Sequence, residues 1–221
     1  MAEQGQRVRR TVWCMAGGAV VAGSLLGGCA PLLVGGAMVG GALVATDRRS
    51  VGIQLEDEAI ERRINRAIAE RVARDLANVT VTSFNRKVLL TGEAITEEVR
   101  QQIEAAARTA ENVRTVENDI FVAPLTTMAQ RNNDLAIAAR VRTALLQDPA
   151  VKSTVIKPVT QRGIVYLMGR VTEAEGEAAA RAAARVEGVQ RVVKVFDYLT
   201  EAEAAEFSKK TPATPPPAPR P

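Results

Sequence analysis

Cys29 is the residue of this chain whose type and surroundings point most directly to chemistry. It follows a start that carries three arginines within ten residues, an uncharged apolar run over 11–26, and two glycines. A basic start, a short apolar middle and small residues at a cut site are typical of a secretory signal peptide. The run is shorter than the about 20 apolar residues of a membrane-spanning helix. We therefore expect residues 1–28 to be removed.

The residues Leu26-Gly27-Gly28-Cys29 resemble the bacterial lipobox, in which a leucine stands three residues before a cysteine with small residues between them. The resemblance implies cleavage before Cys29 and diacylation of its thiol. Acyl chains would then hold the protein to a membrane, at about 0.8 kcal/mol per buried CH₂. Lipoproteins of this kind that stay at the inner membrane commonly carry aspartate at the next position. Ala30 stands there instead, which favours export to the outer membrane.

Three other interpretations of this region remain open. The segment could be an ordinary signal peptide with a chance cysteine. Cys14 and Cys29 could form a disulfide, although Cys14 lies in the apolar run and would leave with the signal. The stretch "RVRRTVW" is a poor match to a twin-arginine signal.

The composition argues against an enzyme and against a nucleic-acid partner. The chain has no histidine, so the usual imidazole base and the commonest metal ligand are absent. No glycine-rich phosphate loop precedes a helix. Without residues 1–28 the chain has 26 basic and 24 acidic residues, net +2, and aromatics make up only 3% of the whole sequence. We expect no catalytic residue, no metal and no cofactor.

The middle of the chain contains an internal sequence repeat. "DEAIERRINRAIAE" begins at Asp57, and "DLAIAARVRTALLQ" begins at Asp134, 77 residues later. In the second copy Ile137, Val141 and Leu145 are spaced by four, which predicts a helix with this face toward the core. The two aspartates are predicted to be helix N-caps or to lie in first turns.

Strands and a second helix follow each predicted helix. "RKVLLTGEA" and "GIVYLMGRV" match at the same offset and are predicted as strands ending at Gly92 and Gly169, where glycine would permit a turn. "NVTVTSF" and "STVIKPV" are predicted to precede them, and helices over 96–110 and 172–186 to follow, with a last strand in each unit. The fold class is therefore α+β, with two tandem units, each a three-stranded sheet covered by two helices on one face.

These elements divide the chain into segments. Residues 31–45 are apolar and rich in glycine and alanine, but short for a second membrane span. "TPATPPPAPRP" at the end favours extended structure because proline lacks a backbone donor. The predicted segments are a signal peptide (1–28), a tether (29–54), a first domain (55–123), a linker (124–133), a second domain (134–200) and a disordered proline-rich tail (201–221).

The order helix–strand–strand–helix–strand, the V-x-L-x-G strand and "VEGVQRV" before the last strand resemble the BON domain. Two such units behind a lipobox resemble the dual-BON lipoproteins of Gram-negative envelopes, from about residue 45 to 199. The resemblance implies an outer-membrane lipoprotein that faces the periplasm, supports envelope integrity and binds anionic phospholipid through the first helix of its second unit. The family has a bulky aromatic there, where this chain has Leu135 and Ala136.

The distribution of charge also indicates the second unit as the one that binds an anionic membrane surface. Residues 55–122 carry 10 basic and 13 acidic side chains, net −3, whereas residues 126–200 carry 11 and 7, net +4. An anionic surface attracts a nearby Lys or Arg by roughly 1 kcal/mol each. The candidate lipid-binding residues are Leu135 as an apolar edge, Arg140 and Arg142 for phosphate contact, and the loop residues Lys152 and Arg170.

Two alternatives stand beside lipid binding. The charged helix faces could be plain solvated surface. The units could also form a protein-interaction scaffold for outer-membrane assembly, division or cell-wall factors, with the acidic first unit as the docking surface.

Overall fold

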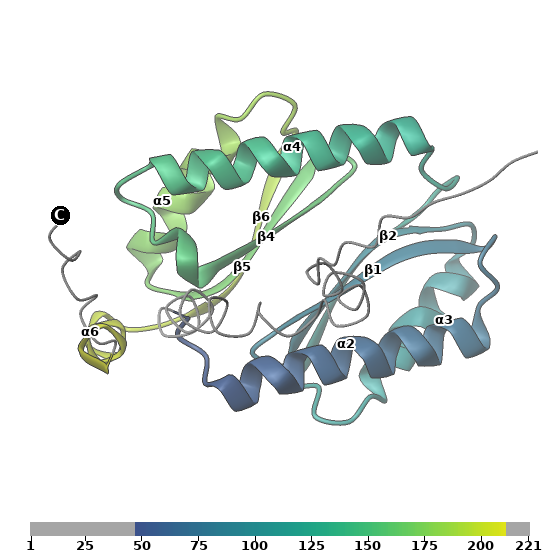
Figure 1. Cartoon of the computed structure of the whole chain (residues 1–221). Helices are drawn as coiled ribbons and strands as arrows, with labels where there is room; N and C mark the ends of the chain where they lie inside the picture. Colours follow the sequence, from purple (N-terminus) through teal and green to yellow (C-terminus); the bar gives the residue numbers. More distant parts are fainter. Residues whose placement is uncertain (1–46, 211–221) are drawn as a thin grey trace, which may run out of the picture. The chain divides into compact units, whose positions relative to one another are not determined.

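The computed structural model describes residues 47–210 (Figure 1). The predicted signal peptide, Cys29, residues 31–45 and the last eleven residues lie outside this range. The described part contains two repeats of the order helix–strand–strand–helix–strand and one further helix. Both repeats belong to a single compact unit. The predicted α+β fold is confirmed.

Each repeat forms its own three-stranded mixed sheet. The first repeat contains α2 (Val51–Arg71), β1 (Ala77–Phe84), β2 (Lys87–Ala94), α3 (Glu97–Arg108) and β3 (Thr115–Val122). The second contains α4 (Met128–Gln147), the short 3₁₀ helix η1 (Ser153–Val155), β4 (Ile156–Gln161), β5 (Ile164–Val171), α5 (Glu173–Ala184) and β6 (Arg191–Tyr198). In both sheets the middle strand pairs antiparallel with the strand before it and parallel with the last strand.

One face of each sheet is covered by the two helices of its own repeat, as predicted (Figure 1). Ile60 and Ile64 on α2 pack with Ile103 on α3 against β2 in the first core. In the second core α4 packs through its predicted inner face. Because the apolar faces of both helices pack against the same sheet, each repeat buries a complete core in fewer than 80 residues.

The opposite faces of the two sheets share a third core, which the sequence analysis did not predict. Phe84 and Leu89 of the first sheet form one buried cluster with Tyr166, Met168 and Val195 of the second. Consequently β2 and β5 are buried on both faces. The first five residues of β5, IVYLM, are all apolar rather than alternating with polar ones.

The helices begin earlier than predicted, and the aspartates are not caps. Ser50 caps α2 by accepting the Ile53 N–H at 3.3 Å, and Thr127 caps α4 in a capping box with Gln130. Thus the predicted tether overlaps α2 and the predicted linker overlaps α4. Asp57 and Asp134 lie inside the helices, 2% and 7% exposed, because their carboxylates bind the hairpin turns of the sheets.

The two glycines at matching positions of the repeats do not end strands. Gly92 lies within β2 at φ +125, and a Cβ there would come 2.0 Å from the Asn78 carbonyl oxygen. Gly169 lies within β5, where a Cβ would come 2.6 Å from the Val155 oxygen. Glycine is therefore required for close approach of the neighbouring backbone, and the prediction of a turn at these positions was wrong.

Two further boundaries differ from the prediction. The strand expected over 153–159 begins only at Ile156, because the preceding residues form η1. The predicted disordered tail begins with the helix α6 (Glu201–Lys210). The prolines start only after this segment, Thr200 accepts the Glu203 N–H at 3.3 Å at the helix start, and Ala204 is buried. Local capping and packing thus support a helix where composition had indicated a tail.

Candidate functional site

The helix α4 presents a core face and an outer face. Ile137, Val141 and Leu145 are 0–2% exposed and pack in the second core, which confirms the predicted inner stripe. The capping box at Thr127 extends the helix by two turns ahead of Asp134. This extension gives α4 a long exposed surface.

That outer face carries large apolar side chains and a free arginine. Met128, Leu135 and Leu146 are 67%, 68% and 70% exposed. Positions spaced by seven and by four fall on one stripe of a helix, so Arg142 lies in line with them. Among the described residues, Arg142 makes no ion pair. We call Met128, Leu135, Arg142 and Leu146 the α4 outer face.

A hollow adjoins one end of this face. Arg142 and Leu146 line it together with Ile156 and Pro158 at the start of β4, and its volume is about 230 Å³. Its wall is mostly apolar, whereas the arginine at its rim is cationic. An apolar floor beside a cation is the chemistry that suits an acyl chain next to a phosphate headgroup.

The charges of α4 are one-sided. Its only acid is the buried Asp134, while Arg131, Arg140 and Arg142 are exposed. The helix α2 at the same place in the first repeat carries five acids and four arginines along its length. Of the two equivalent helices, α4 is therefore the one that an anionic surface attracts.

The structure brings together only two of the five candidate lipid-binding residues. Leu135 and Arg142 share the α4 outer face. Arg140 points elsewhere and donates to the Glu187 carbonyl oxygen at 3.2 Å. Lys152 and Arg170 lie in a separate cluster. Sequence reasoning missed Met128 and Leu146, although their spacing of seven and eleven residues from Leu135 was a usable signal.

The separate cluster is centred on Arg48 and Glu175. Arg48 is 6% exposed, and its guanidinium binds both oxygens of Glu175 at 2.6 and 2.8 Å. Arg48 and Arg170 each donate to the other's carbonyl oxygen, at 2.7 and 3.2 Å. Lys152 lies 2.9 Å from Glu175. The residues just before α2 are thereby fixed to the start of α5 in the second repeat.

Electrostatics hold this cluster in its ionised form. Burial of Glu175 opposes its ionisation, but hydrogen bonds from Arg48, the Thr172 backbone and Lys152 outweigh that effect and lower the pKa of Glu175 to about 2. Lys152 and Arg170 are therefore engaged in joining the repeats, not grouped with the α4 outer face.

The part of the chain that the structure describes contains neither a membrane-spanning helix nor a group of metal ligands. Within 47–210, no helix is both long and apolar enough to cross a bilayer. In the same range no three Asp, Glu, His or Cys side chains are grouped so as to hold a metal ion.

Comparison with known protein families identifies the family of the chain. The family model described as "BON domain" matches twice, at residues 56–124 and 133–200. The chain belongs to the BON domain family. The two matches coincide with the two repeats of the structure, so each three-stranded sheet with its pair of helices is one BON domain.

Two curated relatives match this chain over most of their length. The outer membrane lipoprotein DolP of Haemophilus influenzae is 36% identical over 176 residues, which is 79% of this chain and 90% of the relative. The 21 kDa hemolysin of Actinobacillus pleuropneumoniae is 33% identical over 154 residues, or 69% and 79%. A solved structure of the C-terminal domain of CdsD from Chlamydia trachomatis covers 63% of this chain and 96% of its own, at 10% identity and a TM-score of 0.27.

Proposed function

We propose that this BON protein is an outer-membrane lipoprotein. It is anchored through acylated Cys29, faces the periplasm, and binds anionic phospholipid through the α4 outer face of its second BON domain. Its role is non-catalytic and supports envelope integrity. The similarity to the outer membrane lipoprotein DolP supports the location. The observation that carries lipid binding is the row of exposed apolar side chains and Arg142 on a helix without an exposed acid.

The expected affinity of this face alone is modest. Each exposed side chain that enters the acyl boundary contributes at most about 1.5–3 kcal/mol, and each nearby arginine roughly 1 kcal/mol. The anchor changes this balance because it holds the domain beside the membrane. A tether of short length raises the effective concentration of the second contact to about the millimolar range. At this effective concentration, the α4 outer face is occupied by lipid even if its own affinity is weak.

The test uses a fragment of residues 47–210, which retains all three cores, and therefore isolates the α4 outer face from the anchor. The fragment is sedimented with vesicles of neutral lipid that contain increasing fractions of phosphatidylglycerol, at low and at physiological salt. We expect binding that rises with the anionic fraction and falls with salt.

The matched variants locate the contact. The double change Leu135→Glu with Arg142→Glu should reduce vesicle binding by about tenfold or more, since it removes an apolar contact and reverses a charge. The control, Leu55→Glu with Arg62→Glu, makes the same changes on the exposed face of α2 and should leave binding unchanged. Equal loss in both variants would contradict the assignment to α4. No binding by the unaltered fragment would leave the anchor as the sole membrane contact and favour the scaffold hypothesis.

A further inference from the structure

The two BON domains place a buried aspartate at equivalent positions. Asp57 and Asp134 are 77 residues apart, and each is the seventh residue of its helix. Each carboxylate accepts two backbone N–H groups from the hairpin turn of its own sheet, at 2.7–2.8 Å. The two sites can therefore be compared atom by atom.

In the first domain the carboxylate is fully occupied. Arg49 Nη1 donates to Asp57 Oδ2 at 2.8 Å, and Ser83 Oγ donates to Oδ1 at 2.7 Å. Each oxygen thus accepts two hydrogen bonds. The Arg49 guanidinium also lies 3.9 Å from the centroid of the Phe84 ring and 2.7 Å from Asp47. A cation between a carboxylate and an aromatic face completes this site.

In the second domain the same site lacks these two donors. The offset of 77 puts Thr126 where the first domain has Arg49, and Thr160 where it has Ser83. Within residues 47–210, neither threonine hydroxyl has a hydrogen-bond partner, although both oxygens are buried. Asp134 accepts only the Arg162 and Gly163 N–H groups. Each of its oxygens retains one acceptor position.

The nearby cation does not serve Asp134. The Arg162 side chain lies 3.6 Å from Glu93 Oε1 and 5.5 Å from the centroid of the Phe121 ring. Glu93 is itself 0% exposed, so the Arg162 guanidinium pairs with Glu93 rather than with Asp134. Within the described range, Asp134 forms no ion pair.

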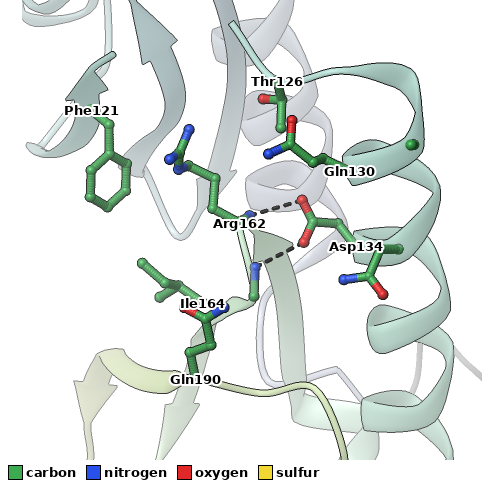
Figure 2. Close-up of a pocket in the computed structure, with 10 residues that line it drawn as sticks. Phe121, Thr126, Gln130, Asp134, Arg162, Ile164 and Gln190 are labelled. Atoms are coloured by element: carbon green, nitrogen blue, oxygen red, sulfur yellow. Dashed lines mark hydrogen bonds between the residues drawn. The ribbon is translucent and has the colours of Figure 1, made fainter. Parts of the chain in front are cut away.

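A cavity of about 600 Å³ opens at this place. Figure 2 shows Asp134 and Gln130 projecting from α4 toward the turn at Arg162, with Phe121 beyond Arg162. Thr126, which is 4% exposed and has an unpartnered hydroxyl, is part of the wall. The cavity thus offers a carboxylate and a hydroxyl. The Gln130 amide oxygen is already used, because it accepts the Thr127 backbone N–H and hydroxyl at 2.8 and 2.9 Å.

We propose that this cavity binds the guanidinium group of an arginine side chain from a partner protein, in the position that Arg49 occupies in the first domain. The planar fork of arginine suits the open lone pairs of a carboxylate. The Thr126 hydroxyl accepts a further N–H group. The volume exceeds that of one side chain, so flanking residues of an extended segment fit as well. The inference does not depend on lipid binding, because it uses a different surface of the second domain.

The experiment uses the full chain in detergent micelles and follows backbone amide shifts. The probes are N-acetyl-arginine methylamide, the peptide Gly-Arg-Gly, and the citrulline analogue of each, which has the same shape without the charge. We expect both arginine probes to shift the amides of Arg162, Gly163 and Asp134 in a saturable way. Tighter binding of the peptide identifies a protein segment as the source of the arginine. Citrulline should bind about tenfold more weakly or worse. Equal shifts from citrulline, or no saturable shift, would overturn the proposal.

Two variants separate binding from folding. Thr126→Arg supplies the missing side chain within the chain itself, and should abolish arginine binding while the melting temperature stays the same or rises. Asp134→Asn removes the negative charge and should weaken binding by about tenfold or more. Arg62→Glu, on the exposed face of α2, is the control and should bind the probes as the unaltered chain does. Retention of binding in both Thr126→Arg and Asp134→Asn, with the fold intact, would contradict the proposal.

Discussion

The two BON domains share one topology and differ in what binds the first helix to the hairpin. In the first domain Asp57 is held by four donors, one of them the guanidinium of Arg49. In the second, Asp134 is held by two backbone groups beside an open cavity. The exposed faces of the two first helices also differ. The helix α2 mixes acids with arginines, whereas α4 exposes arginines and apolar side chains. At this site the first domain fills every acceptor position of its aspartate, whereas the second domain leaves acceptor positions open.

The largest expected effect comes from removing the two buried carboxylate charges. Asp57→Asn leaves Arg49 without one of its two carboxylate partners and sets an amide N–H₂ against backbone donors, so it should lower the free energy of unfolding by about 3–5 kcal/mol. Asp134→Asn breaks no ion pair and should cost about 1–3 kcal/mol. Urea unfolding of residues 47–210 measures both. The comparison fails if the Asp134 variant loses as much stability as the Asp57 variant.

The next largest effect is a loss of stability at low pH, caused by the carboxylate at the start of α5 in the second domain. Glu175 has a pKa of about 2 in the folded state, below its ordinary value. It therefore contributes stability that is complete above about pH 4.5 and is lost as the pH falls toward 2. The equivalent position in the first domain is Val99, which cannot titrate.

Changing Arg48 isolates that contribution. Arg48→Ala should lower the free energy of unfolding at neutral pH by about 2–3 kcal/mol, and should flatten its decline between pH 4.5 and 2, because the carboxylate loses its main partner. Thermal unfolding across this pH range provides the measurement. A decline of the same steepness with and without Arg48 would show that other carboxylates carry the acid sensitivity.

The smallest effect lies in the hairpin turns. Arg86 has φ 65, a conformation that favours glycine, and Gly163 stands at the equivalent position with φ 71. Arg86→Gly should raise the free energy of unfolding by about 0.5 kcal/mol, whereas Gly163→Ala should lower it by about 1 kcal/mol. Both values come from urea midpoints. Changes of the same sign in the two domains would argue against equivalent turns.

Sequence alone was sufficient for the repeat, the order of elements and the inner helix faces. Ile137 and Val141 are predictable because local spacing of apolar residues is the physical cause of their burial. Helix starts were missed because Asp57 and Asp134 have the chemistry of caps, and only the fold shows that hairpin amides compete for those carboxylates. The role of Gly92 was missed for a similar reason, since it depends on how closely β1 passes.

The contacts between the domains could not be predicted from local pattern. Arg48 and Glu175 are 127 residues apart in the chain, and no periodicity connects them. The shared core did leave one signal, because the uninterrupted apolar run at the start of β5 indicates burial on both faces. The α4 outer face was found in part, through Leu135 and Arg142. The cavity beside Asp134 is lined by residues that lie far apart in the sequence, so no local pattern predicts it.

The most direct test of the account is to ask which first helix meets the membrane. The chain's single tryptophan lies in its first 28 residues, so the fragment 47–210 has none. Leu135→Trp and Leu55→Trp place one probe on α4 and one on α2, at sites 68% and 59% exposed. Fluorescence is then recorded with vesicles containing phosphatidylglycerol and brominated acyl chains. The account predicts a blue shift and bromine quenching for tryptophan at 135 and neither for tryptophan at 55. Quenching at 55 alone, or at neither site, would contradict the claim that the second BON domain binds the membrane.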